Sequence, residues 1–357
     1  MPILIAALAL IAQAIPAEPP VLQLHGSVDV VYALNTNRPF DRASFLPGTG
    51  TSGRRAGELN VNAAALEVAV DPRPVGFHLT LAFGSGPEVL HSGEPAGSAT
   101  GSDIWRSVYQ ATVSWTAPIG SGLLLEAGIY PSHIGYESFF SKDNWNYTHG
   151  WMGEFSPYYQ AGLKASYVFD AHWSAQVHLL NGWQLIGDNN RAKAVGTQIA
   201  WTSERATVAF NTFAGPELPG DDSHWRLFGD LTAQVKAASW LTLGATADLG
   251  RQDRPQGAAL WHAAALYARA AWSAIAAVAL RAEYYDDRDG FFSGASQVLR
   301  DATATLELRP AAQLILKLEA RHDIAGAAAF SSQRDASGTP KFSRTQTLAL
   351  ASAVATF

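Results

Sequence analysis

The sequence predicts an all-β fold, a closed transmembrane antiparallel β-barrel of about sixteen strands with short periplasmic turns and long external loops. Charged residues make up 16% of the 357 residues, against roughly 25% in soluble domains, while aromatic residues reach 11%. Mean hydropathy is +0.00, and beyond the N-terminal segment no apolar run approaches the roughly 20 residues of a membrane helix. An apolar surface without apolar runs is expected when lipid-facing and lumen-facing residues alternate.

Three segments show this alternation most clearly. From Leu24 to Asn35, one row is apolar and is expected outside, whereas the other is mostly polar or small. The segment Trp225 to Lys236 repeats the pattern, and its polar row carries both signs of charge. From Gln313 to Asp323, leucines face one side and charged residues the other, with Ile315 and His322 out of pattern. Core strands of soluble proteins do not carry so many charges, so these segments are predicted to span a membrane.

Two alanine-rich segments, Leu260 to Trp272 and Ile275 to Glu283, favour a helix by intrinsic propensity. Their spacing between neighbouring segments predicts strands instead. The chain ends on Phe357, and alternate residues before it place the alanines at 349, 351, 353 and 355 on a weakly apolar outer face. Bacterial outer-membrane barrels resemble this in closing on a strand whose last residue is aromatic.

The connections alternate in length, as expected for short periplasmic turns and long external loops. Short turns are predicted at residues 71–74, 119–122, 169–171, 202–204, 237–239, 273–274 and 309–311. Longer polar stretches lie at residues 36–57, 86–105, 132–157, 186–192, 216–223, 252–257, 287–297 and 325–342. Eight long loops imply about sixteen strands, an even number as a closed antiparallel barrel requires.

The first residues, Met1 to Ala17, form an apolar stretch that ends in small residues, with Ala12-Gln13-Ala14 as one cleavage-like site. Residues 1–17 are therefore predicted to be a secretory signal peptide, and residues 18–357 a single barrel domain. The alternative is a buried N-terminal helix or strand, which prolines at 16, 19 and 20 would interrupt.

A family resemblance enters between Gly128 and Phe169 and again from Leu179 to Asn190. The matching positions are Gly128, Gly135, Glu137, Asn144, Asn146, Pro157, Gly162, Asn181-Gly182-Trp183 and Asp188-Asn189-Asn190. This pattern of strand, long loop and return resembles the OmpL-like putative β-barrel porin-2 family. The resemblance implies an outer-membrane channel. The sequence departs from the family at Ile129 and Tyr130, where a basic residue and a Phe are expected.

The third long loop, Ser132 to Pro157, is the longest and the most aromatic. In porins that resemble this architecture, the third loop folds into the lumen and narrows it. Its candidate constriction charges are Glu137, Lys142, Asp143 and Glu154. The alternative is a loop packed as an external lid.

Charged residues on the lumen-facing side of the later strands are candidates for the pore wall, where their field would set selectivity. They are Arg226, Asp230, Lys236, Arg281, Glu283, Asp301, Glu307, Arg309, Lys317, Glu319 and Arg321. The alternative for any single member is that it pairs across strands and stabilises the barrel.

Several classes of function find no support in the sequence. There is no cysteine, no Gly-x-Ser-x-Gly motif and no pair of histidines spaced to chelate zinc, so neither a catalytic site nor a cofactor is predicted. A net charge of −6 gives no electrostatic basis for binding nucleic acid. The prediction is therefore a non-enzymatic channel of the bacterial outer membrane that passes small hydrophilic solutes or ions.

The expected surroundings are outer-membrane lipid and lipopolysaccharide, with a homotrimer left open because sixteen-stranded porins commonly form trimers. Two alternatives of other classes remain. One is a barrel of the same membrane that acts as an enzyme or adhesin, which would show no conductance. The other is a soluble secreted β-protein, which would be extracted without detergent.

Overall fold

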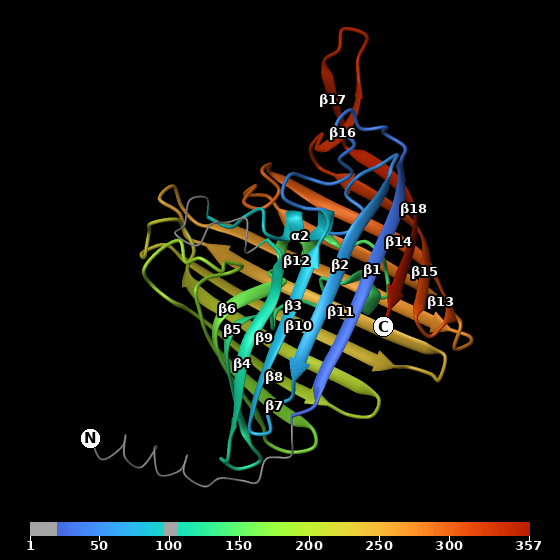
Figure 1. Ribbon diagram of the computed structural model, residues 1–357. Helices are drawn as coiled ribbons and strands as arrows, with labels where there is room; N and C mark the ends of the chain where they lie inside the picture. Colours follow the sequence, from blue (N-terminus) through green and yellow to red (C-terminus); the bar gives the residue numbers. More distant parts are fainter. Residues whose placement is uncertain (1–19, 96–105) are drawn as a thin grey trace.

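The computed structural model describes residues 20–95 and 106–357, and it shows sixteen antiparallel strands closed into a barrel (Figure 1). Strands that follow one another in the chain are neighbours, from β1 to β15, and β18 closes the sheet between β15 and β1. At the closing seam, Ser27 pairs with Thr356 and Asn35 with Leu348. The predicted fold class, strand number and closing strand are confirmed.

The barrel wall is formed by long strands on one side and shorter ones on the other. Its strands are β1 (Leu22–Asn35), β2 (Leu59–Val70), β3 (Val75–Phe83), β4 (Val108–Ala117), β5 (Leu123–Pro131), β6 (Tyr159–Val168), β7 (Trp173–Leu180), β8 (Ala194–Thr202), β9 (Ala206–Pro216), β10 (Trp225–Lys236), β11 (Leu241–Gln252), β12 (Ala259–Ala271), β13 (Ala276–Asp287), β14 (Gln297–Ala311), β15 (Leu314–Ala325) and β18 (Thr345–Thr356).

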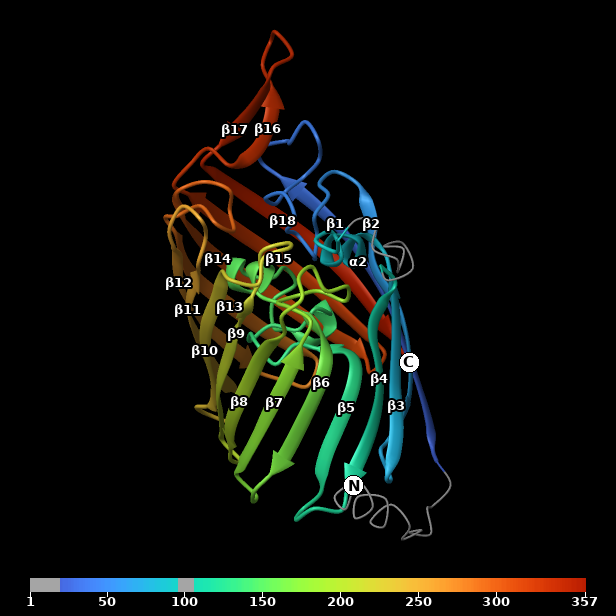
Figure 2. The ribbon, with the colours of Figure 1, turned by 90° about the vertical axis from the view of Figure 1, so that its left-hand side faces the viewer.

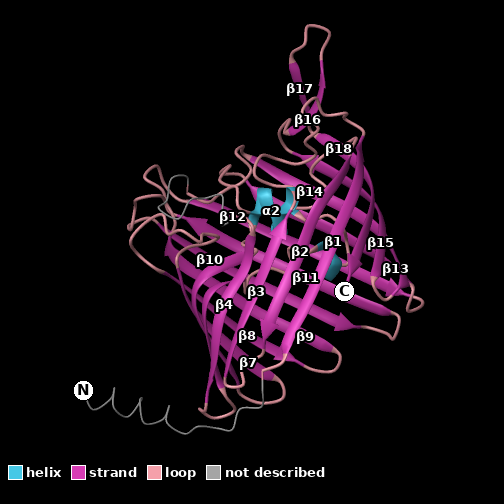
Figure 3. Ribbon diagram, viewed as in Figure 1, coloured by secondary structure: helices cyan, strands magenta, loops and turns pink. Residues whose placement is uncertain are grey.

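Few other elements occur in the described residues (Figure 3). They are the helices α2 (Ser85–Leu90) and α4 (Trp151–Phe155), the 3₁₀ turn η1 (Ser141–Asp143), and a hairpin of β16 (Phe330–Arg334) and β17 (Pro340–Ser343). The hairpin lies in the last long connection and projects beyond the barrel rim (Figure 1). Within the described ranges, no helix is long and apolar enough to cross a membrane.

Side chains alternate between the two faces of the wall as predicted. In β15, Leu318 and His322 point outward and are exposed, whereas Lys317, Glu319 and Arg321 point inward and are buried. The two positions that broke the pattern are explained, because Ile315 is buried inside and His322 bonds Thr347 on the outer face through the 2.9 Å contact of its Nδ1 with the threonine hydroxyl.

The alanine-rich segments form β12 and β13, as their spacing predicts. Helix propensity is overridden because each segment lies between two strands whose backbone groups require partners in the ladder. The pairing is continuous from Ala271 with Ala277 to His262 with Asp286, and small side chains on both faces do not disturb it.

One predicted turn is wrong. The turn expected at residues 309–311 lies at residues 312–313, because β14 continues to Ala311. Pro310 has no N–H to donate, and it lies where the register between β14 and β15 shifts, between Leu308 and Ala311. Proline is tolerated at such a bulge, so it did not mark the strand end here. The other six predicted short turns are confirmed, and the predicted signal peptide lies outside the described residues.

The outward face of β15 provides a test of which residues face lipid and at what depth in the bilayer they lie. We expect Leu318→Arg, near the strand centre, to lower the free energy of unfolding by about 2–4 kcal/mol, because it places a charge near the bilayer midplane. The same substitution at Leu314, the first residue of the strand, should cost about 0–1 kcal/mol. Urea unfolding in lipid vesicles measures both, and equal costs at the two positions would contradict the assigned orientation.

Candidate functional site

The third long connection, residues 132–158 and hereafter loop L3, turns into the barrel rather than away from it. Figure 2 shows this green segment, with its short helical turns, inside the ring of strands. Its apolar centre is Trp151, which is fully buried. The ring of Trp151 contacts Phe45 of the first long connection at 6.1 Å and Phe330 of β16 at 6.0 Å between centroids. Three long connections therefore pack together within the mouth of the barrel.

Strand β13 holds L3 through two charged side chains of opposite sign. Arg281 donates from Nη1 to Glu137 Oε1 of the loop at 2.8 Å and to the Thr148 carbonyl, while its Nη2 donates to Asp301 at 2.8 Å. Glu283 accepts hydrogen bonds from two loop backbone N–H groups, those of Trp151 and Met152. Charge-assisted hydrogen bonds of this kind are stronger than neutral ones.

Strand β15 repeats the arrangement with three residues in alternate positions. Lys317 donates from Nζ to the carbonyls of Ser141 at 2.7 Å and Asn144 at 2.6 Å. The carboxylate of Glu319 accepts from the N–H groups of Tyr147 and Thr148, from the Thr148 hydroxyl, and from Thr305 on β14. Arg321 donates to the carbonyl of His149.

Contacts on other parts of the wall hold the remaining parts of L3. On β1, Asp29 accepts from Ser141 Oγ at 2.7 Å and from the Tyr147 hydroxyl at 3.1 Å. On β10, Asp230 accepts from the Gly135 N–H at 2.8 Å.

At the start of L3, the His133 ring lies 4.1 Å from the ring of His178 on β7 and stacks on it. Its Nδ1 contacts the Gln160 side chain, and its Nε2 contacts the Thr212 carbonyl at 3.0 Å. Burial lowers the pKa of His133, with a smaller contribution from Lys164 in the same direction. In this buried environment the His133 ring is neutral and stacks on the ring of His178.

The four candidate constriction residues divide into two pairs. Glu137 is buried on Arg281, and Glu154 is buried on the first long connection, where it accepts from the Gly50 N–H at 2.8 Å and from Thr51. Lys142 and Asp143 instead remain accessible, with 30% and 47% of their side chains exposed, and their charged groups are 2.9 Å apart.

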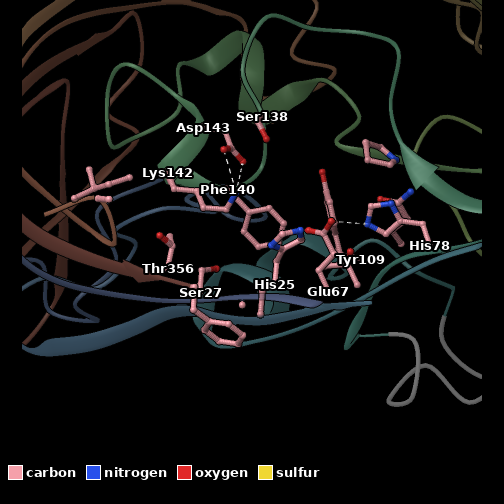
Figure 4. A pocket seen from close by; sticks show the side chains of 18 of the residues that line it. His25, Ser27, Glu67, His78, Tyr109, Ser138, Phe140, Lys142, Asp143 and Thr356 are labelled. Atoms are coloured by element: carbon pink, nitrogen blue, oxygen red, sulfur yellow. Dashed lines mark hydrogen bonds and ion pairs between the residues drawn. The ribbon is translucent and has the colours of Figure 1, made fainter. Parts of the chain in front are cut away.

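Lys142 and Asp143 line a cavity of about 540 Å³ between L3 and the inner wall (Figure 4). On the opposite side of this cavity lie His25 of β1 and the Glu67 carboxylate, whose Oε1 is 3.1 Å from Nε2 of His78. The cavity is also lined by Phe357 and by Ala312 of a short turn, so it lies toward the end of the barrel that carries the short turns.

The structure places the candidate wall residues in four settings. Arg281, Glu283, Lys317, Glu319 and Arg321 are buried against L3, and Asp230 bonds its backbone. Glu307 is buried beneath Arg269 and Arg309. Lys236 is exposed at the end of β10. Arg226 is enclosed by the rings of Trp183, Phe291 and Phe292, at 5.0 to 5.6 Å from their centroids.

Sequence reasoning missed several residues of the site. Asp29 follows the inward alternation of β1, but its role depends on contact with a loop more than a hundred positions later. Arg269 points into the barrel, as Tyr267 two positions earlier does. The alternation is hard to see in the sequence because alanines surround both residues.

A buried carboxylate occurs at the mouth as well, in the connection 217–224. Glu217 accepts from the Trp183 N–H at 2.9 Å through Oε2, while its Oε1 has no hydrogen-bond partner among residues 20–95 and 106–357. Burial raises the pKa of Glu217 to about 7, although Arg226 and the Trp183 N–H act in the opposite direction. This acid is therefore partly protonated near neutral pH.

The fold and this interior define a class of protein. A closed sixteen-stranded barrel with an apolar outer face, a charged inner wall and a loop folded into the lumen is a porin of the outer membrane. Residues 21–357 match the family described as "Putative beta-barrel porin-2, OmpL-like", and the chain belongs to this family. It is an outer-membrane diffusion channel, a class without enzymatic activity. The predicted family, location and general function are confirmed.

Solved structures share the fold of this chain at low sequence identity. An anion-selective porin from Comamonas acidovorans is 12% identical, with a TM-score of 0.63 over 95% of this chain and 100% of that one. The trimer form of OmpT from Vibrio cholerae is 9% identical, with a TM-score of 0.58 over 95% and 100%. OmpF of Salmonella typhi in complex with daunomycin is 10% identical, with a TM-score of 0.57 over 94% and 97%. No curated protein matches the sequence.

The hold of the wall on L3 can be tested at Glu319. We expect Glu319→Gln to leave the barrel intact, because the ladder is unchanged, but to loosen L3, because an amide cannot accept all four hydrogen bonds. Amide hydrogen exchange of L3 should become roughly ten- to a hundredfold faster. Glu58→Gln, which removes an exposed glutamate from the first long connection, is the control. Unchanged L3 exchange in Glu319→Gln would contradict the assigned anchoring.

The raised pKa of Glu217 predicts a pH dependence of stability. An acid whose pKa rises from 4.5 to about 7 on folding stabilises the folded state most below pH 4.5, and this contribution is lost as pH rises through 7. The loss amounts to about 3 kcal/mol by pH 8. Glu217→Gln, which has no proton to release, should remove this part of the pH dependence of urea unfolding, whereas Glu204→Gln in a short turn should not. Equal pH dependence in all three proteins would refute the assignment.

Proposed function

We propose that small hydrophilic solutes cross the barrel beside L3, and that L3 is the constriction of the channel. The observation that supports this most directly is the cavity between L3 and the inner wall, which Lys142 and Asp143 of the loop line together with His25 and Glu67 of the strands (Figure 4). Accessible charges of both signs suit a water-filled passage, because they interact with hydrated solutes without a large desolvation cost.

In this proposal the charges of the site have two different tasks. Lys142 and Asp143 act on the solute, because they are accessible in the cavity. Glu137 and Glu154 position the loop, as do the buried charges of β13 and β15, because their hydrogen bonds are made to L3 or its neighbours. Removing a positioning charge should therefore change the shape of the passage. Removing an accessible charge should change the electrostatic field in the passage.

We further propose that the barrel functions as a homotrimer surrounded by outer-membrane lipid and lipopolysaccharide. The support is the similarity to a structure described as a trimer, together with an outer face rich in exposed leucine, valine and aromatic side chains. Chemical crosslinking in native membranes would measure the number of associated barrels.

The test of the channel is conductance in a planar bilayer. The purified barrel should conduct ions, and deletion of residues 139–150 should raise the conductance by removing the constriction. Deletion of residues 332–341 in the β16–β17 hairpin, which lies outside the barrel, is the matched control. A second variant, Lys142→Ala with Asp143→Ala, keeps the loop backbone in case the deletion disturbs folding, and it should alter ion selectivity. Unchanged conductance and selectivity in both L3 variants would refute the constriction.

A further inference from the structure

Two arginines of the inner wall, on strands β12 and β14 to either side of β13, share one buried carboxylate. Arg269 of β12 donates from Nη2 to Glu307 Oε1 at 2.9 Å, and Arg309 of β14 donates from Nε to the same oxygen at 3.0 Å. Glu307 has 5% of its side chain exposed, whereas Arg269 has 28% and Arg309 42%. The carboxylate therefore lies beneath the two guanidinium groups and fixes their positions, while the guanidinium groups face the open side.

The cluster carries an excess of positive charge. The two guanidinium groups of Arg269 and Arg309 share the single carboxylate of Glu307, so the formal sum of the three groups is +1. Lys317 lies 3.9 Å from Glu307 Oε2, but it is buried and bonded to L3, so it is not counted among the charges that a solute meets.

Asp143, the other carboxylate of L3 near the two arginines, does not cancel this excess, because it is paired with Lys142 at 2.9 Å. Glu67 lines the adjoining cavity, which does not include Arg269. At physiological ionic strength, charges are screened over about 8 Å, so the nearest groups dominate the local field. A solute ion beside the two arginines thus meets a positive potential.

The arginines lie on the proposed route. A cavity of about 540 Å³ is lined by Arg269, Arg309 and Glu307 together with Lys142 and Asp143. The cavity that contains His25 and Glu67 shares Arg309, Lys142 and Asp143 with it. The two spaces therefore adjoin at the accessible charges of L3.

The donors of the two arginines are not all used. A guanidinium group carries five N–H donors in a planar fork that matches the oxygens of a carboxylate or phosphate. Glu307 occupies Nη2 of Arg269, and Nε and, more weakly, Nη2 of Arg309. The Nη1 groups of both have no hydrogen-bond partner among the described residues. One arginine would be enough to neutralise the Glu307 carboxylate, so the second arginine leaves an excess of positive charge.

We propose that Arg269 and Arg309, held by Glu307, form a subsite for a small oxyanion, a carboxylate or an inorganic phosphate, and make the channel prefer anions to cations. This inference rests on the proposed route beside L3. The subsite is a place of transient binding during permeation: the solute exchanges water for the free Nη1 donors and leaves toward the short-turn end of the barrel.

The reversal potential in a KCl gradient tests the preference. We expect the wild-type barrel to pass chloride more readily than potassium, and Arg269→Gln with Arg309→Gln to lower the chloride-to-potassium permeability ratio by about threefold or more, because the local excess charge is removed. Arg309→Gln alone, which removes the more exposed arginine, should lower the ratio by a smaller factor. It serves as the second variant in case the double variant folds poorly. Arg251→Gln is the matched control, because Arg251 is also paired with a carboxylate, Asp253, but is exposed on the outer face.

Phosphate and acetate distinguish binding from general charge selectivity. Each is titrated against a constant chloride concentration, and each should reduce the chloride current through the wild-type barrel more than through the double variant. An equal reduction in both proteins would overturn the subsite.

The outcomes separate this inference from the proposed function. A conducting wild-type barrel that prefers potassium, or a double variant with an unchanged ratio, overturns the anion subsite and leaves the channel in place. A wild-type barrel that does not conduct overturns the proposed route and the subsite with it.

Discussion

The structure depends on one constraint, which is that every backbone N–H and C=O group at membrane depth must be paired within the protein. Lipid offers no hydrogen bonds, and each unpaired group would cost several kcal/mol. The chain meets this constraint by closure, through the pairing of β1 with β18 from Ser27 to Asn35. Once the ladder is closed, the outer face is free to be apolar and the inner face to be charged. Weak strand formers such as the alanines of β12 and β13 are then carried by the pairing of their neighbours.

The same constraint, transferred to the lumen, explains how L3 is held. Inside the barrel, the backbone groups of the loop have lost part of their hydration. The charged side chains of the wall opposite the loop have also lost hydration. Glu283 and Glu319 accept from loop N–H groups, while Lys317, Arg281 and Arg321 donate to loop carbonyls. Each partner satisfies the other, and neither would be stable alone in this position, because an unpaired buried charge is more costly than a paired one. The loop and the wall are therefore one structure.

The sequence predicted the barrel because alternation and loop lengths are local properties, visible in segments such as Trp225 to Lys236. It also predicted that the third long loop turns into the barrel and lies against charges of the later strands. It could not separate Glu137 from Lys142, since both are charged residues five positions apart in one loop. Their difference, burial against Arg281 or exposure in a cavity, arises from the path of the loop across the lumen. The prediction of a turn near Pro310 was wrong for a related reason, because the effect of a proline depends on whether its partner strand can accommodate a bulge.

The anchoring of L3 also determines where selectivity can arise. Charges that are buried in bonds to the loop contribute little to the force on a solute, because their partners offset their fields and they have no direct contact with the passage. The lumen therefore has many charged residues but few accessible ones near L3, mainly Lys142, Asp143, Glu67, Arg269 and Arg309. A count of lumen charges would suggest an acidic channel, whereas the accessible subset has an excess of positive charge. Under the proposed anion preference, selectivity would thus follow from which charges the loop leaves uncovered, rather than from the total that the strands carry.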